Sequence, residues 1–514
     1  MLSRNAWSVH FTSRDLPRLR EGLWYLRIRP EEWECWLDDQ GIPDGTPYLL
    51  SPRYVYDVNP NAYLHRVDYL EGPLNSQRNR ARAMAGYFTF LHVARGGKGW
   101  RDATMDDHRA YRHWRRQDAK GPRIDGSTWS QDTSHVFQFY EHAKREGWVS
   151  EIPIPLREAR ESATSPGGPP VVDKRGRKSR KVPASYAHDE GGQRIEWLPA
   201  ASYRRWRDVG VRGYDRCGLP RDNFRGRWAS RNSTFTDKLV RTGMRLEEQG
   251  TLLRTEIPLG KGPPGYSKFW LPRSIAKRQS ARWVYLPAST RRDLTAYDLE
   301  DRALVVAEAQ AAGRYHRIRR PMVITDPASP RMAQYTSGAM VGKRVDVRLL
   351  GPLERRRLFV DTERGLEPAM FWLGEDGMPL SLSTWKDMFT TANSRCEEAG
   401  LEERAHAHLC RHTFAVITLE QLQRGHIAAL GEMNPGQRQH YQRIFGDPVD
   451  WIRRRLGHTS QLSTLIYLHA LQELEMETRM ALVPDTWEDP RDTPVAELGD
   501  EAPPFDLPEA EVTQ

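Results

Sequence analysis

The last quarter of the chain carries a short series of residues that suit phosphate chemistry. His408 and Arg411 are three residues apart, and His458 precedes Tyr467 by nine residues. Side chains at i and i+3 of a helix share a face, so His408 and Arg411 are expected to point the same way. Phosphoryl transfer to a tyrosine requires cationic and hydrogen-bond-donating groups beside the phenol, because without a metal the side chains alone must neutralise the phosphate. The spacing therefore predicts a site for that chemistry.

Neighbouring histidines raise the question of a metal. His406, His408 and His412 lie at offsets of two and four, so they cannot all face one ion from a helix, and no carboxylate cluster accompanies them. The chain also lacks a phosphate-binding glycine loop. The sequence therefore predicts no metal and no cofactor.

Length and composition limit the class of protein. A chain of 514 residues predicts two or three domains. It has no apolar run long enough to cross a membrane, its start lacks the apolar core of a signal peptide, and its four cysteines form no CxxC pair. We therefore expect a cytoplasmic protein without a membrane span, a disulfide framework or a zinc finger.

Charge is unevenly distributed along the chain. The net charge is +9, but residues 488–514 hold nine acids and one arginine, which leaves +17 on the rest. A basic body of this size favours a polyanionic partner, and nucleic acid is the first candidate.

Residues 76–152 have the periodicity of a small helical bundle. Apolar side chains recur at i, i+3, i+4 and i+7, first at Met84, Tyr87, Phe88 and Leu91 and again at Val136, Phe139, Tyr140 and Ala143. Thr104, with an acid three residues later, is expected to cap a further helix. Residues 1–75, ahead of this bundle, show turns and extended segments but no recognisable chemistry.

Residues 153–193 are expected to form a linker. A cluster of proline and glycine is followed by six positive charges in eight residues, at Lys174, Arg175, Arg177, Lys178, Arg180 and Lys181. Such a stretch buries too little apolar surface to fold alone. It is suited to contact a phosphate backbone; a solvated linker and a nuclear localisation signal are the alternatives.

Residues 194–483 are expected to form a larger domain in which helices dominate. Helical patterns cover 235–249, 294–312, 383–398, 407–423, 449–456 and 462–481, while strand-like residues flank Lys277. This predicts a mainly α, α+β fold with a small β-sheet. Residues 314–368 are too long for a plain loop and are interpreted as an insertion, and the acidic tail, 484–514, is expected not to fold.

With these residues in view, the chain resembles the tyrosine recombinases, the phage-integrase family that includes lambda-type and Xer-type enzymes. His408 and Arg411, in AHLCRHTFA, match the family's His-x-x-Arg element. His458 matches the histidine of its Leu-Gly-His element, and Tyr467, in STLIYLHA, matches the nucleophile. The resemblance covers roughly residues 76–480.

A second arginine matches from far upstream. Arg245 lies in RTGMRLEEQGTLL, which is similar to the family's Thr-Gly-Leu-Arg-x-x-Glu, and Glu248 falls on the acidic position. Met244 replaces the usual leucine, a change that conserves volume.

The family's catalytic lysine has three candidates. Lys277 is followed five residues later by an arginine and an apolar strand, as in the family's β-hairpin. Lys261 lies in the local Gly-Lys-Gly string often seen there, but two prolines follow it and little room precedes it for a strand pair. Lys268 is the third candidate. The layout favours Lys277.

The resemblance implies a role for each residue. Arg245 and Arg411 would hold the non-bridging phosphate oxygens, because the guanidinium fork is planar and always charged. Tyr467 would attack the phosphorus, and since a phenol of pKa ~10 is a poor nucleophile, it needs a proton acceptor, for which His408 is the best candidate. His458 would donate a hydrogen bond to the phosphate, and Lys277 would protonate the departing 5′-oxygen.

The same resemblance implies an architecture and partners. Residues 76–152 would be a helical, SAM-like core-binding domain, which with the catalytic domain would clamp duplex DNA; four subunits would act on two DNA sites in a prokaryotic, nucleoid-associated setting. Residues 1–75 could bind accessory DNA sites or brace the fold. The segment after Tyr467 could dock on a neighbouring subunit or on its own domain.

Three functions fit these observations. The first is a site-specific DNA recombinase, an integrase of a phage or mobile element, that works through a 3′-phosphotyrosyl bond. The second is a type IB topoisomerase-like nicking and resealing enzyme, which the small helical domain disfavours. The third is a DNA-binding protein whose catalytic set has decayed, although no member of the set is missing.

Overall fold

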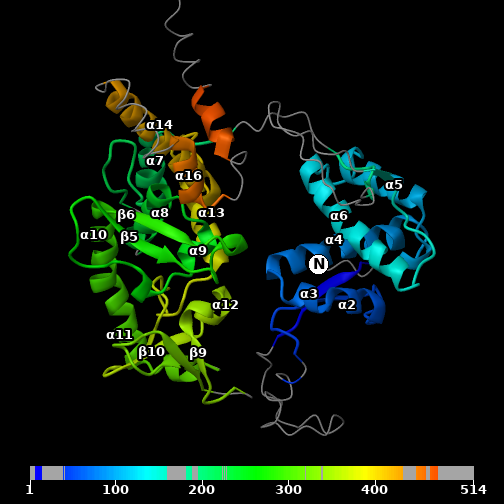
Figure 1. Cartoon of the computed structure of the whole chain (residues 1–514), viewed down its shortest axis with the longest axis horizontal. Helices are drawn as coiled ribbons and strands as arrows, with labels where there is room; N and C mark the ends of the chain where they lie inside the picture. Colours follow the sequence, from blue (N-terminus) through cyan, green and yellow to red (C-terminus); the bar gives the residue numbers. More distant parts are fainter. Residues whose placement is uncertain are drawn as a thin grey trace, which may run out of the picture. The chain divides into compact units, whose positions relative to one another are not determined.

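The computed structural model describes residues 6–13, 39, 41–158, 181–187, 195–222, 224, 226, 228–318, 320–336, 340–431, 447–458 and 464–472 (Figure 1). The chain divides into two compact units, Met1–Gly192 with Gln334–Arg344, and Gln193–Ala333 with Val345–Gln514. Within the described ranges, no helix is both long and apolar enough to span a bilayer.

The first unit is built on the predicted helical bundle. Its main helices are α4 (Leu74–Ala94), α5 (Met105–Arg116) and α6 (Gly126–Arg145). The apolar stripes at 84–91 and 136–143 are buried in one core, as their periodicity predicts. Thr104 forms a reciprocal capping box with Asp107, which fixes the start of α5.

This core extends beyond the expected limits of the bundle at its N-terminal side. Strands β1 (Ser8–Phe11) and β2 (Pro47–Leu50) pair antiparallel, and α2 (Val58–Leu64) and α3 (Val67–Leu70) follow. Leu49, Tyr63 and Leu64 pack into the bundle core. Residues 41–75 therefore brace the bundle, because their few apolar side chains find partners there.

The expected linker is also structured at both ends. Strand β3 (Leu156–Glu158) pairs with β4 (Lys181–Pro183), and Ile154 and Ala187 are buried in the bundle core. The indole of Trp129 donates to the backbone oxygen of Ser185. Composition alone suggested a linker throughout 153–193, but the two flanks supply hydrogen-bond partners and apolar surface that the bundle needs. Lys181 is exposed in β4, whereas the other five basic residues of that run lie outside the described residues.

In the second unit, helices pack against a β-hairpin, one face of which stays exposed. The helices include α7 (Ala200–Trp206), α8 (Ala229–Thr242), α9 (Leu246–Gly250), α10 (Ala288–Tyr297), α11 (Ala303–Ala311), α13 (Leu382–Glu398), α14 (Ala407–Gly431) and α16 (Pro448–Leu456). The hairpin consists of β5 (Tyr266–Leu271) and β6 (Arg282–Pro287), with Trp270 opposite Trp283. Residues 464–472 form a further helix. The mainly helical α+β fold class is confirmed.

One expected helix is interrupted at an instructive place. The pattern over 235–249 predicts a continuous helix, but α8 ends at Gly243, which adopts φ 64°. A Cβ on Gly243 would lie 2.2 Å from the ring of Phe414, so only glycine fits this turn. The turn lets Arg245 start α9 as its N-cap residue.

Residues 314–368 contain a sheet rather than a loop. Its strands are β7 (Met322–Ile324), β8 (Met332–Tyr335), β9 (Arg344–Asp346), β10 (Leu358–Thr362) and β11 (Gly365–Pro368), in the order β11-β10-β7-β8-β9. β10 runs parallel to β7 and antiparallel to β11. This sheet is separate from the hairpin that carries the candidate lysines.

Candidate active site

A single buried arginine joins the segments that carry the candidate residues. Arg411, on α14, is 1% exposed. Its guanidinium donates to the carbonyl of Gly243 and to the carbonyl of Leu456, each at 2.5 Å. Gly243 lies two residues before Arg245, and Leu456 lies two residues before His458. Arg411 therefore positions the turn before α9 and the end of α16 around its own side chain.

A second buried cluster lies around Glu248. Its carboxylate is 1% exposed and accepts hydrogen bonds from Arg245 at 2.9 Å and from Arg282 at 2.6 and 3.2 Å. It also accepts from the backbone N–H of Arg245, which caps α9. Burial alone would raise the pKa of Glu248, but Arg282 and Arg245 outweigh it and lower that pKa to about 2. Glu248 is thus an ionised anchor for two arginines.

Arg282 extends this cluster to α16. Its Nε donates to the carbonyl of Arg455 at 2.9 Å, so the start of β6 is tied to the helix that leads to His458. Gly457 ends α16 in the left-handed conformation, with φ 67°. A Cβ there would lie 3.0 Å from the hydroxyl of Ser280, in the hairpin turn. The β5–β6 turn and the end of α16, just before His458, are therefore neighbours.

Tyr467 lies inside this arrangement rather than at its surface. The side chain is 1% exposed, and its hydroxyl is 3.0 Å from Nδ1 of His412. Burial raises the pKa of Tyr467 above its usual value, while the positive charges of Arg411 and Arg245 act in the opposite direction. Both arginines are therefore close enough for their charge to reach the phenol.

His408 lies on α14, beside His412. Its side chain is exposed. The centre of its ring lies 4.3 Å from that of His412, and it contacts this ring rather than forming a hydrogen bond to Tyr467. Loss of solvation, followed by the charge of Arg411, lowers the pKa of His408. Arg411 is buried and His408 is exposed, but the charge of Arg411 still acts on His408. Along α14, the ring of His408 lies beside that of His412, one helical turn further on.

His412 is the residue that sequence reasoning missed. It was considered only as a metal ligand, although it directly follows Arg411 and lies four residues after His408, on the same helical face. That spacing could have identified His408 and His412 as neighbours. Nothing in the sequence, however, shows which of the two rings forms the hydrogen bond to Tyr467.

His458 also lies beside the phenol of Tyr467. Its ring is nearly parallel to that of Tyr467, at 15° and 6.2 Å between centroids. Its Nδ1 is 3.0 Å from the hydroxyl of Thr464, which is fully buried. Burial and the charges of Arg411, Arg245 and Arg282 lower the pKa of His458 to about 4, so it is neutral at pH 7.

The three candidate lysines lie at different places on the hairpin. Lys277 is exposed in the turn between β5 and β6, and its charge contributes to the lowered pKa of His408. Lys268 faces outward from β5, with its Nζ 5.0 Å from the ring centre of Trp283. Lys261 lies in the loop that precedes β5, at the end of the hairpin opposite the turn. In this loop the N–H of Gly260 donates a hydrogen bond to the hydroxyl of Thr295, on α10. Lys277 is therefore close enough to His408 for its charge to act on that ring.

The turn that holds Lys277 is strained. Arg278 and Gln279 both adopt φ 55°, the left-handed region that non-glycine residues rarely occupy. The hydroxyl of Ser280 donates to the carbonyl of Lys277 at 2.8 Å and stabilises the turn. Strain of this kind is retained where the surroundings hold the chain in place.

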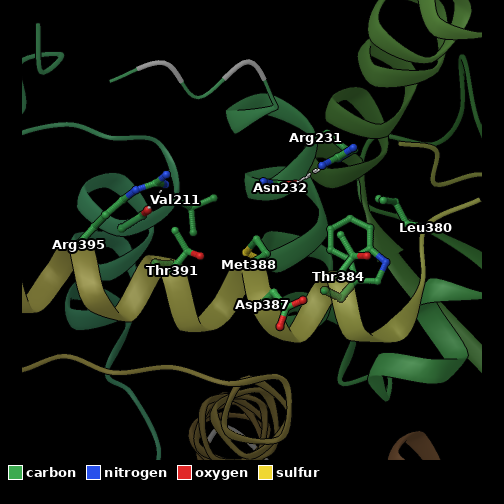
Figure 2. Close-up of a pocket in the computed structure, with 12 residues that line it drawn as sticks. Val211, Arg231, Asn232, Leu380, Thr384, Asp387, Met388, Thr391 and Arg395 are labelled. Atoms are coloured by element: carbon green, nitrogen blue, oxygen red, sulfur yellow. Dashed lines mark hydrogen bonds between the residues drawn. The ribbon is translucent and has the colours of Figure 1, made fainter. Parts of the chain in front are cut away.

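A hollow elsewhere in the unit is distinct from this cluster. It is lined by residues of α8 and α13, with Arg231, Asp387 and Arg395 among them (Figure 2). The guanidinium of Arg231 donates to the carbonyl of Leu373, and that of Arg395 to the carbonyl of Gly210. None of the residues around Tyr467 lines it. Among the described side chains, no group of three or more His, Cys, Asp or Glu is arranged to hold a metal ion.

The likeness of this chain to known proteins is one of fold. No family model matches the chain, and no curated protein does. Among solved structures it is similar to XerA recombinase, at 14% identity over 82% of this chain and 99% of that one, with a TM-score of 0.29. It is also similar to the Tn1549 transposon integrase in complex with a circular intermediate DNA, at 12% identity over 82% and 98%, with a TM-score of 0.42. A lambda integrase dimer bound to a COC′ core site matches at 12% identity over 80% and 93%, with a TM-score of 0.39. These are recombinases and integrases, the class of protein that the sequence motifs resemble.

Proposed function

We propose that this chain is a tyrosine-type site-specific DNA recombinase that cleaves and rejoins strands through a 3′-phosphotyrosyl intermediate. The observation that carries the proposal is the buried hydroxyl of Tyr467, hydrogen-bonded to a histidine and within electrostatic reach of Arg411 and Arg245. A tyrosine that only filled an apolar core would not require two arginines and two histidines around its side chain.

Arg411 has donors to spare for a phosphate. Arginine has five N–H groups, and the two carbonyls of Gly243 and Leu456 take one each from the two terminal nitrogens. Burial, followed by the charges of Arg245 and Arg282, lowers the pKa of Arg411 to about 9, so it remains cationic at neutral pH. A phosphodiester anion would offset this accumulated positive charge, and the site is therefore suited to bind one.

The proposed reaction balances without a metal or a nucleotide. The oxygen of Tyr467 attacks the phosphorus, a P–O(Tyr) bond forms, and the bond to the 5′-oxygen breaks. The departing electron pair goes to that 5′-oxygen, which takes a proton from Lys277, while the phenolic proton passes to a neighbouring base. Arg245 and Arg411 stabilise the charge on the non-bridging oxygens, and one such donor is typically worth a factor of about 100 to 1,000 in rate.

The remaining parts of the chain are assigned around this reaction. We propose that the helical unit contacts duplex DNA together with the catalytic unit, that the basic run at 174–181 adds phosphate contacts, and that four subunits act on two DNA sites. Because such affinity depends on released counterions, binding should weaken steeply as salt rises. An integrase role for a phage or mobile element fits the same chemistry.

Covalent trapping of DNA tests the proposal. A duplex with a nick just downstream of the cleaved phosphate loses its 5′-hydroxyl fragment, so the tyrosyl adduct accumulates and migrates as a protein–DNA band. The wild-type chain and a matched Tyr285→Phe variant should form it, and Tyr467→Phe should bind DNA without forming it. Adducts that persist in Tyr467→Phe would overturn the assignment, and relaxation of a plasmid without any recombination site would favour a topoisomerase.

A further inference from the structure

The phenol of Tyr467 has one side-chain hydrogen-bond partner in the described part of the chain. Nδ1 of His412 lies 3.0 Å from the hydroxyl, and the two ring centres are 5.5 Å apart. A phenol is a stronger acid than a neutral imidazole N–H, so the favourable arrangement has the hydroxyl donating and Nδ1 accepting. The remaining proton of the ring then lies on Nε2.

The other two histidines are differently engaged. Nδ1 of His458 forms a hydrogen bond with the hydroxyl of Thr464, and the His458 ring lies nearly parallel to the phenol. His408 meets the ring of His412 rather than the hydroxyl. Neither is placed to receive the phenolic proton directly.

Resting on the proposed function, we propose that His412 is a catalytic residue of this site: its Nδ1 accepts the phenolic proton of Tyr467 as the oxygen attacks the phosphorus. His408 then acts as a positioning residue, since its ring packs against His412 from one helical turn away. The step balances, because the O–H bond of Tyr467 breaks as the P–O bond forms and the proton moves along a hydrogen bond that already exists.

The electrostatic surroundings link this step to the presence of DNA. Burial, followed by His408 and Arg411, lowers the pKa of His412 to about 4, so the ring is neutral and able to accept at pH 7. A phosphate bound to Arg411 would cancel one of the charges that make His412 a weak base. The titratable or charged groups that act on or contact this ring are His406, His408, Arg411, His458 and Tyr467.

The test compares His412→Asn with His408→Asn in the adduct assay, using the full-length chain. Asparagine keeps a hydrogen-bond acceptor near Nδ1 but cannot take up a proton. We expect His412→Asn to slow adduct formation about 100-fold or more, the usual worth of a general base, and His408→Asn to slow it much less. DNA binding and the melting temperature should match those of the wild type, which separates a chemical defect from misfolding.

Two further readouts distinguish a base from a structural contact. Replacing the bridging 5′-oxygen by sulfur gives a leaving group that needs no proton, so it should rescue loss of the general acid in Lys277→Gln but not His412→Asn. The rising acidic limb of the pH–rate profile should also disappear in His412→Asn.

The outcomes separate this inference from the proposed function. If the wild-type chain forms no adduct, or Tyr467→Phe forms one, the proposed function itself fails. If the wild type reacts and His412→Asn reacts at the same rate with the same pH profile, only the role of His412 fails. If His408→Asn is instead the slow variant, the base is His408.

Discussion

Replacing Glu248 with glutamine removes one charge from the arginine cluster while keeping the shape of the side chain. The carboxylate holds Arg282 and Arg245, and their combined effect lowers its pKa from 4.5 to about 2 despite burial. At about 1.4 kcal/mol per pH unit, this corresponds to roughly 3 kcal/mol of stability at neutral pH. We therefore expect Glu248→Gln to lower the melting temperature by roughly 6–12 °C.

The pH dependence has a defined sign. Because the pKa of Glu248 is depressed in the folded chain, its contribution is fully present above about pH 4.5 and is lost as the pH falls towards 2. Thermal unfolding of the full-length wild type and Glu248→Gln, followed at pH 7 and at steps below pH 4.5, should show the difference in melting temperature shrinking over that window.

A neighbouring acid on the same helix provides the matched control. Burial raises the pKa of Glu247, so its ionised form is not stabilised by the fold in the way that Glu248 is. Glu247→Gln should leave the melting temperature at pH 7 unchanged or slightly higher. Equal losses in the two variants would refute the reasoning, because the arginine cluster would then contribute nothing specific.

The remaining predictions concern the hairpin turn and Gly457, which ends α16 just before His458. Lys277→Gln should slow adduct formation about 100-fold or more, with recovery on the substrate that carries a bridging sulfur, whereas Lys261→Gln should react normally; the reverse pattern would move the acid to Lys261. Gly457→Ala should cost about 1 kcal/mol from its positive φ and also reduce cleavage, because the added Cβ meets the hairpin turn and shifts His458. Gly313→Ala, also at positive φ but facing open space, should cost similar stability and leave cleavage intact, as denaturant unfolding and adduct assays would show.

Local patterns predicted the elements that depend on nearby residues. The apolar stripes of α4 and α6 and the capping box of α5 follow from side chains within two helical turns of one another, and each forms as its spacing indicates. The break at Gly243 did not follow, since it depends on the ring of Phe414, more than 160 residues away. The packing of residues 41–75 and of the linker flanks on the bundle was not predicted for the same reason, since it too depends on contacts between segments that are distant in the sequence.

By itself, the sequence determined the inventory of the candidate site: two arginines, histidines, a tyrosine and a set of possible lysines, in an order that resembles one family. Only the tertiary structure decided which of them meet. It buried Arg411 between the carbonyls of Gly243 and Leu456, and it set His412 rather than His408 on the hydroxyl of Tyr467. The physical reason is that helical spacing specifies a direction from the axis, whereas a hydrogen bond requires a second element at a defined distance, and only packing supplies that.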